Sequence, residues 1–390
     1  MTLRADRMNR LREVLAGHAA GNGVGLTWAL DRGGETLVDA VGTTEPGGSD
    51  PIRRDTIFRI SSMTKPVTAV AALLLVEECR LRLDDPVDDL LPELADRRVM
   101  ADPAGPLTET VPAVRPITLR DVLTFRLGLG MDFAASHPQP ILAAMAELGV
   151  GAGPPAPGHL PPPDEWLARL GTLPLAHQPG ERWLYHTSAE VLGVLVSRAA
   201  GQPLEGFMRE RIFDPLGMRD TGFSVPPAAL DRFGACYGTD PTDPYDPRDG
   251  QWATPPAFAN GGDGLVSTID DFLAFARMLR ARGAYDGGRL LSRTTVETMT
   301  TNQIGDVTAA GPDPSGTAGW GFGLRVQLVR ADPSRPVGSY GWDGGLGSSW
   351  ANDPAEGLIG IIMTNQMWTS PNPPAVCRDF WTSAYAAIDD

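Results

Sequence analysis

The stretch ISSMTKPVTAV, residues 60–70, contains Lys65, the only lysine in the chain. All the remaining residues among the 33 lysines and arginines are arginine. Pro66 predicts where a helix begins, because proline is tolerated in a helix only in the first turn. This places the helix start at about Ser62. Residues at positions i and i+3 share one face of a helix. We therefore expect the Ser62 hydroxyl and the Lys65 amine to be neighbours.

A serine beside a lysine indicates nucleophilic chemistry. Serine is a poor nucleophile at neutral pH and needs a base within hydrogen-bond reach. Burial near a positive helix end lowers the pKa of a lysine toward the range of a useful base, whereas the guanidinium of arginine stays protonated. The chain therefore has a chemical reason to keep Lys65. A lysine also falls three residues after a serine by chance, so the pair alone does not decide the function.

Composition and charge exclude several classes of protein. The 390-residue chain carries a net charge of -15 and its arginines are scattered, so no nucleic-acid surface is predicted. Cys79, Cys236 and Cys377 lie far apart without a C-x-x-C pair, so we expect three buried thiols rather than disulfides or a zinc site. The N-terminal residues predict an amphipathic helix, and no apolar run reaches the roughly 20 residues of a membrane span. We expect a soluble cytoplasmic protein without a membrane partner.

The order of the expected elements predicts an α+β fold. Strands are indicated near both ends of the chain and helical pieces in the middle, so one antiparallel sheet is expected to draw on both termini and to be flanked by helices. We predict a sheet domain from residues 1–60 plus 261–390. Residues 61–260 would form an inserted, mostly helical region. Its proline-rich stretches, residues 151–163 and 240–256, are expected as loops over the active site.

A second element supports the interpretation of the serine. The motif S-x-x-K at the start of a buried helix resembles that of the serine β-lactamases and penicillin-binding proteins, whose class C branch continues with Tyr-x-Asn. GERWLYHTSAEVLG, residues 180–193, looks like this second motif, with Tyr185 as a relay for the serine proton. Thr187 replaces the asparagine as the implied substrate contact, which leaves part of the hydrogen bonding of Lys65 unassigned. His186 is expected at the surface or behind the catalytic side chains rather than as a base.

A third element has the Trp-x-Gly form found in the family VIII carboxylesterases. SYGWDGGLGSSWANDPAEGLIGIIMTNQ, residues 339–366, is similar to it, with Trp342 in place of the usual lysine and Gly344 as the glycine. The resemblance implies substrate contacts at Trp342 and Gly344. It also implies an oxyanion hole made by the N–H groups of Ser62 and Gly345. Without the lysine, a penicillin's carboxylate lacks a cationic partner, which favours neutral esters over β-lactams.

The resemblance as a whole implies a β-lactamase/DD-peptidase-like carboxylesterase with Ser62, Lys65 and Tyr185 as catalytic residues. It would cleave small carboxylic esters through an acyl-serine, with either Lys65 or Tyr185 as the base. The alternatives are an acyltransferase, a β-lactamase or D-amino-acid peptidase, and a non-catalytic binding protein on the same scaffold. The absence of a Gly-x-Ser-x-Gly motif disfavours an α/β-hydrolase. The expected partner is a small-molecule ester. No metal or cofactor is expected, because the histidines lack metal-ligand spacing: His18, His137, His159, His177 and His186.

Overall fold

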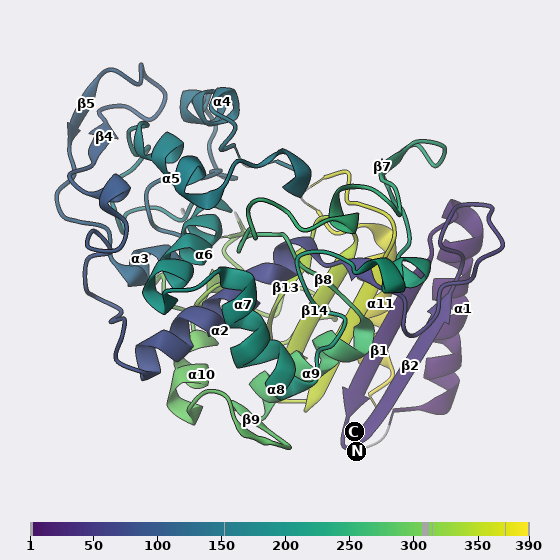
Figure 1. Ribbon diagram of the computed structural model, residues 1–390. Helices are drawn as coiled ribbons and strands as arrows, with labels where there is room; N and C mark the ends of the chain where they lie inside the picture. The colour runs from purple at the N-terminus through teal and green to yellow at the C-terminus, as the bar shows by residue number, and fades with distance from the viewer. Residues whose placement is uncertain (1–2, 152, 306–311, 314, 371, 389–390) are drawn as a thin grey trace.

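A seven-stranded antiparallel sheet forms the centre of the molecule (Figure 1). The computed structural model describes residues 3–151, 153–305, 312–313, 315–370 and 372–388. The strand order is β11-β12-β13-β14-β15-β1-β2. The bounds are β1 (Leu26–Arg32), β2 (Glu35–Val41), β11 (Ala318–Trp320), β12 (Arg325–Gln327), β13 (Tyr340–Gly344), β14 (Ser348–Asp353) and β15 (Leu358–Thr364). The predicted α+β architecture, with a sheet built from both ends of the chain, is confirmed.

The strands β1 and β15 pair with each other and are buried along their whole length. Trp28 and Ile362 pack into an apolar cluster beneath two terminal helices. Ala29 and Ile361 project into the main core, which includes the helix on the other face of the sheet. These covering helices are α1 (Ala5–Asn22) and α11 (Ala375–Ala386) on one face, and α9 (Ile269–Arg280) on the other. Burial on both faces explains why β15 reads as a nearly continuous apolar run.

The helical region between the sheet segments packs around α2, which has twelve buried residues out of fourteen. Its principal partner is α6, and both helices lie among those to the left of the sheet in Figure 1. The helices here are α2 (Thr64–Glu77), α3 (Leu119–Leu123), α4 (Pro140–Glu147), α5 (Pro163–Gly171), α6 (Thr187–Ala200), α7 (Leu204–Met208) and α8 (Asp214–Leu216), with α10 (Arg293–Met299) later in the chain. The division into residues 1–60 plus 261–390 and residues 61–260 remains a prediction.

Short elements connect these layers. Two-stranded ladders join β3 (Phe58–Arg59) to β8 (Val266–Ser267), β4 (Arg98–Met100) to β5 (Thr110–Pro112), β6 (Cys236–Tyr237) to β7 (Pro244–Asp246), and β9 (Ala284–Tyr285) to β10 (Gly288–Arg289). Short 3₁₀ helices are η1 (Ser61–Met63), η2 (Pro92–Leu94), η3 (Pro157–His159), η5 (Pro227–Arg232) and η6 (Gln251–Ala253). The segment η4 (Arg209–Phe213) is a π-helix between α7 and α8. The two proline-rich stretches contact each other, since the Tyr245 hydroxyl donates to the Pro155 carbonyl at 2.8 Å. Their predicted place over the active site remains a prediction.

Local sequence signals agree with the structure at most turns and depart from it at three places. The segment Asp31-Arg32-Gly33-Gly34 predicts a hairpin turn, which is confirmed, with Gly33 and Gly34 at φ 62° and 87° between β1 and β2. The helix expected to start at about Ser62 begins as the 3₁₀ turn η1 and becomes α-helical at Thr64. The run GWGFGLRVQLV, residues 319–329, predicts one strand, but it forms the end of β11 and β12 with a tight turn between them. Cys79 is exposed rather than buried.

None of the helices among the described residues combines the length and apolar character required to cross a membrane.

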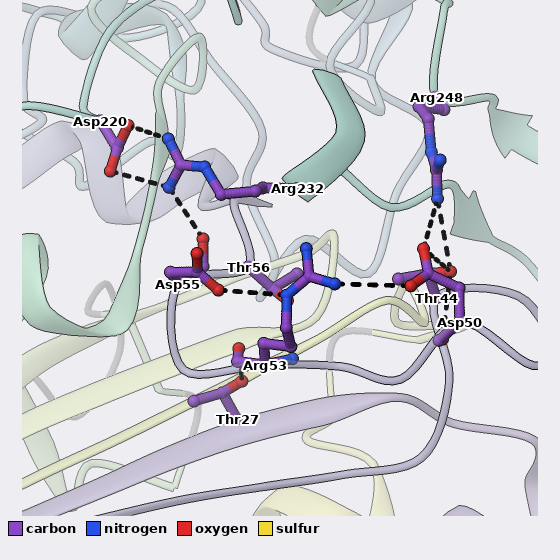
Figure 2. Close-up of polar contacts among 9 residues, drawn as sticks. All are labelled: Thr27, Thr44, Asp50, Arg53, Asp55, Thr56, Asp220, Arg232 and Arg248. Carbon is purple, nitrogen blue, oxygen red and sulfur yellow. Dashed lines mark hydrogen bonds and ion pairs between the residues drawn. The ribbon is translucent and has the colours of Figure 1, made fainter. Parts of the chain in front are cut away.

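Buried and half-buried ion pairs fix the segment that leads from β2 to β3 and on to Ser62. Arg232 bridges Asp220 and the Asp55 carbonyl, and Arg248 contacts Asp50 (Figure 2). Arg248 Nη2 lies 3.0 Å from Asp50 Oδ2. One residue before Ile60, Arg59 is 4% exposed and donates through Nε to Asp246 at 2.7 Å.

We expect Asp246→Ala to lower the free energy of unfolding by about 3–5 kcal/mol, because it leaves the Arg59 guanidinium buried without its anion. Urea denaturation measures this change. The exposed pair of Arg54 with Asp270 is the control, and Arg54→Ala should cost less than about 1 kcal/mol. A loss for Asp246→Ala as small as the control would show that the Arg59 pair does not stabilise the fold.

Candidate active site

Ser62 lies in the turn η1, at the junction between the sheet and α2. Its side chain is almost buried, with the residue 7% exposed. The preceding residue, Ser61, has φ 46°, a sparsely populated conformation for a residue other than glycine. The Ile60 carbonyl accepts hydrogen bonds from Met63 N–H and from the Ser348 hydroxyl, both at 3.0 Å. These contacts hold the turn against the sheet and fix the direction of the Ser62 side chain.

Lys65 is fully buried, and its amine contacts Ser62. The distance from Lys65 Nζ to Ser62 Oγ is 2.8 Å, and Nζ also donates to the Gly262 carbonyl at 2.7 Å. The helical spacing therefore brings the two side chains together as predicted. The carbonyl of Gly262 comes from a loop almost two hundred residues away, and its contact with the lysine could not be read from the spacing.

Tyr185, two residues before the start of α6, contacts the same serine. Its hydroxyl is 2.9 Å from Ser62 Oγ, and its ring centroid is 4.8 Å from Lys65 Nζ. The backbone of Tyr185 exchanges two hydrogen bonds with Met131, at 2.8 and 3.0 Å. Gly130 makes this approach possible, because a Cβ there would lie 2.5 Å from the Tyr185 carbonyl oxygen. The three predicted catalytic side chains are thus in mutual contact.

Trp342, on β13, contacts the tyrosine directly. Its indole Nε1 donates to the Tyr185 hydroxyl at 3.0 Å. This hydrogen bond fixes the position of the phenolic oxygen beside Ser62. The sequence placed Trp342 among the substrate contacts, and its hydrogen bond to Tyr185 was not foreseen.

Aromatic side chains surround Tyr185 and set its position. Phe133 and Trp183 lie 5.2 and 5.6 Å from the Tyr185 ring, measured between centroids. Trp320 packs edge-on against Trp342 at 4.7 Å. Phe133 is 40% exposed, so this wall extends from the core to the surface. The sequence analysis missed these rings, and no periodic signal joins positions so far apart.

The glycines predicted next to Ser62 lie at the end of β13, which packs against η1. Gly344 is buried, and a Cβ there would lie 2.3 Å from the Ile60 carbonyl oxygen, so only glycine allows this approach. Gly345 is half-buried, and a Cβ there would meet no atom within 4 Å. The space beside Gly345 suits a substrate. The oxyanion hole made by the N–H groups of Ser62 and Gly345 remains a prediction.

Thr187 is the first residue of α6 and is fully buried. Its hydroxyl has no hydrogen-bond partner among the described residues. The contact of Thr187 with a substrate remains a prediction. His186, which was expected at the surface or behind the catalytic side chains, is 5% exposed and lies 3.4 Å from Lys65 Nζ. It is therefore behind the lysine.

Within the described part of the chain, no group of three or more histidine, cysteine or acidic side chains could hold a metal ion.

The chain is similar to known proteins in sequence and in fold. The sequence model of the Beta-lactamase family matches residues 11–376. Protein Rv1367c of Mycobacterium tuberculosis is 40% identical, over 97% of this chain and 91% of its own. Esterase EstB of Burkholderia gladioli is 32% identical, over 90% and 88%. The solved structure of EstCE1, described as a hydrolase with promiscuous acyltransferase activity, has a TM-score of 0.79 at 24% identity and covers 97% of this chain and 99% of its own. The β-lactamase/DD-peptidase-like fold expected from the motifs is confirmed.

We expect Lys65→Arg to slow covalent labelling of Ser62 by a fluorophosphonate probe at least about 100-fold, because a guanidinium keeps the charge but cannot accept the serine proton. Labelling is followed by intact-protein mass spectrometry. Ser62→Ala is the control for the labelled position and should take up no probe. Labelling of Lys65→Arg at the unaltered rate would mean that the lysine does not act as a base.

We expect Trp342→Phe to slow the same labelling reaction about fivefold to tenfold, since it removes one hydrogen bond to Tyr185 and keeps an aromatic ring. Trp320→Phe is the matched control, because the Trp320 indole N–H has no partner among the described residues. The control should change the rate less than about threefold. Equal rates for the two variants would contradict a role for the Trp342 N–H.

Proposed function

The chain belongs to the Beta-lactamase family, and from this membership and the contacts of Ser62 we propose that it is a serine hydrolase of small carboxylic esters. The observation that carries the proposal is the position of the Ser62 oxygen, which lies 2.8 Å from Lys65 Nζ and 2.9 Å from the Tyr185 hydroxyl. A serine with two proton-transferring groups at hydrogen-bond distance is suited to nucleophilic attack.

In the proposed reaction, Ser62 Oγ bonds to the acyl carbon of the ester and gives its proton to the pair Lys65 and Tyr185. The same pair then returns a proton to the alkoxide, so that the alcohol leaves and an acyl-serine remains. Water attacks the acyl carbon in the second half, and the carboxylic acid leaves Ser62. The N–H groups of Ser62 and Gly345 are proposed to bind the oxyanion in both steps.

A neutral ester is the proposed substrate because Trp342 stands in place of the lysine that would pair with a penicillin's carboxylate. The only side-chain N–H of Trp342 donates to the Tyr185 hydroxyl. The aromatic wall at Phe133 and Trp183 is suited to an apolar acyl or alcohol group. The similarity to Esterase EstB also supports an esterase. Within the Beta-lactamase family, we propose that this chain is most similar to the family VIII carboxylesterases.

Acyl transfer uses the same acyl-serine with a different acceptor, so product analysis distinguishes it from hydrolysis. A reaction supplied with an added alcohol or amine should still yield the free acid as its main product. A new ester or amide as the main product would instead identify an acyltransferase. A labelled penicillin should fail to acylate Ser62. The small-molecule ester as partner and the cytoplasmic location stay predictions.

We expect the protein to hydrolyse short p-nitrophenyl esters and Ser62→Ala to lower this activity at least about 1,000-fold, because no other group replaces the nucleophile. Release of p-nitrophenol measures the rate, and the thermal midpoint of the variant confirms that it is folded. Full activity in a folded Ser62→Ala protein would overturn the proposal.

A further inference from the structure

A cluster of buried polar side chains lies near Lys65, in addition to Ser62 and Tyr185. Its members come from the start of α6 and from the loop before β8, and all are at most 5% exposed: His186, Glu190, Asn260 and Asp263. None of them is needed for the packing of an apolar core. Burying four polar side chains around one lysine is costly unless their hydrogen bonds are satisfied, so the arrangement calls for a functional explanation.

His186 reaches Lys65 through an unusual backbone conformation. It has φ 86° and ψ −69°, and the Thr187 N–H donates to the Tyr185 carbonyl at 3.3 Å, two residues back. This is a γ-turn of the strained kind, which is rare in proteins and concentrated at functional sites. Adjacent residues ordinarily point to opposite sides of an extended chain. In this turn both Tyr185 and His186 contact the same lysine.

The hydrogen bonds of Lys65 require an acceptor at the position of His186. An ammonium has three N–H donors, and its neighbours are the Ser62 hydroxyl, the Gly262 carbonyl and His186 Nδ1. A neutral amine keeps two N–H donors and one lone pair. If Gly262 and His186 take the two donors, the lone pair points at Ser62. Without an acceptor at His186, the amine is free to rotate its lone pair away from the serine.

The surroundings of His186 favour the tautomer that leaves Nδ1 free to accept. Nε2 lies 3.6 Å from Glu190 Oε1 and 3.6 Å from Asp263 Oδ2. A proton on Nε2 faces these two acceptors, and Nδ1 then presents its lone pair to Lys65. Burial raises the pKa of Asp263, but a carboxyl group accepts a hydrogen bond in either protonation state.

The cluster also connects the two acceptors of Lys65. Asn260 Nδ2 donates to Glu190 Oε1 at 2.9 Å, and Asn260 Oδ1 accepts from the Gly262 N–H at 2.7 Å. One amide side chain therefore contacts both the carboxylate that faces His186 and the backbone N–H of Gly262, the residue whose carbonyl faces Lys65. The Thr187 hydroxyl is not part of this network, since it has no partner among the described residues.

We propose that His186 is a positioning residue that accepts a hydrogen bond from Lys65 through Nδ1 and so keeps the lysine lone pair directed at Ser62. This proposal rests on the proposed function, because it assigns His186 a role in activating the same serine. His186 does not touch the substrate or the reacting atoms. It acts through Lys65, with its tautomer held by Glu190 and Asp263.

Two substitutions of similar shape separate the acceptor from the packing. His186→Asn keeps an acceptor oxygen close to the position of Nδ1, and asparagine tolerates positive φ better than most residues. His186→Leu fills similar space without an acceptor. His18→Ala is the control for loss of a histidine, because His18 binds Asp379 between α1 and α11, in the cluster on the other face of the sheet.

We expect His186→Leu to lower kcat for a p-nitrophenyl ester and the rate of fluorophosphonate labelling by about 10- to 100-fold, with KM changed less than about twofold. The rates of His186→Asn should stay within about fivefold of those of the unaltered protein, and the rates of His18→Ala should equal those of the unaltered protein. Thermal midpoints verify folding. An unchanged rate in folded His186→Leu would overturn the proposal, as would a His186→Asn rate as low as that of His186→Leu.

The tautomer provides a test that does not depend on catalysis. In ¹⁵N-histidine NMR spectra of the unaltered protein, with His186 assigned by its loss in His186→Asn, we expect a proton on Nε2 and none on Nδ1. A proton on Nδ1 would overturn the proposed contact. If the unaltered protein takes up no fluorophosphonate, the proposed function fails, whereas the NMR result still decides the contact between His186 and Lys65.

Discussion

The burial of one amine against one hydroxyl is the constraint on which the rest of this structure depends. Lys65 has no exposed surface, so each of its polar contacts has to come from the protein. Ser62 supplies one from the same turn, and the Gly262 carbonyl supplies another from a distant loop. Satisfying the hydrogen bonds of this buried amine thus requires the start of α2, the start of α6 and the loop before β8 to meet at one point.

The close packing of the sheet and of Tyr185 around Ser62 depends on two glycines, which have no side chain. Gly344 lets the end of β13 lie against the Ile60 carbonyl, and Gly130 lets the backbone of Met131 pair with Tyr185. These contacts bring Trp342 to the tyrosine hydroxyl. The oxygen atoms of Ser62 and Tyr185 and the nitrogen of Lys65 are therefore positioned by close backbone packing as well as by their own hydrogen bonds.

Local periodicity was sufficient to predict part of the site and of the fold. The i, i+3 spacing in the first turn predicted the contact of Ser62 with Lys65, and family resemblance predicted Tyr185. The sequence did not indicate the hydrogen bond from Trp342 to Tyr185, because it joins segments that only the folded sheet brings together. It also did not indicate that Thr187 is fully buried, since whether a side chain at a helix start faces solvent or the core depends on what packs over it. The contact of His186 with Lys65 was not predicted, because it depends on a positive φ at His186.

The pairing of β1 with β15 has a consequence for how the protein is made. The chain is synthesised from its N-terminus, so β1 is complete long before Thr364, the partner of Leu26, leaves the ribosome. At about 5–20 residues per second, that interval is on the order of tens of seconds. During it, the edge of β1 that β15 will cover is an unpaired apolar strand, of the kind that other chains pair with. The nascent chain is therefore most prone to aggregation before its sheet can close.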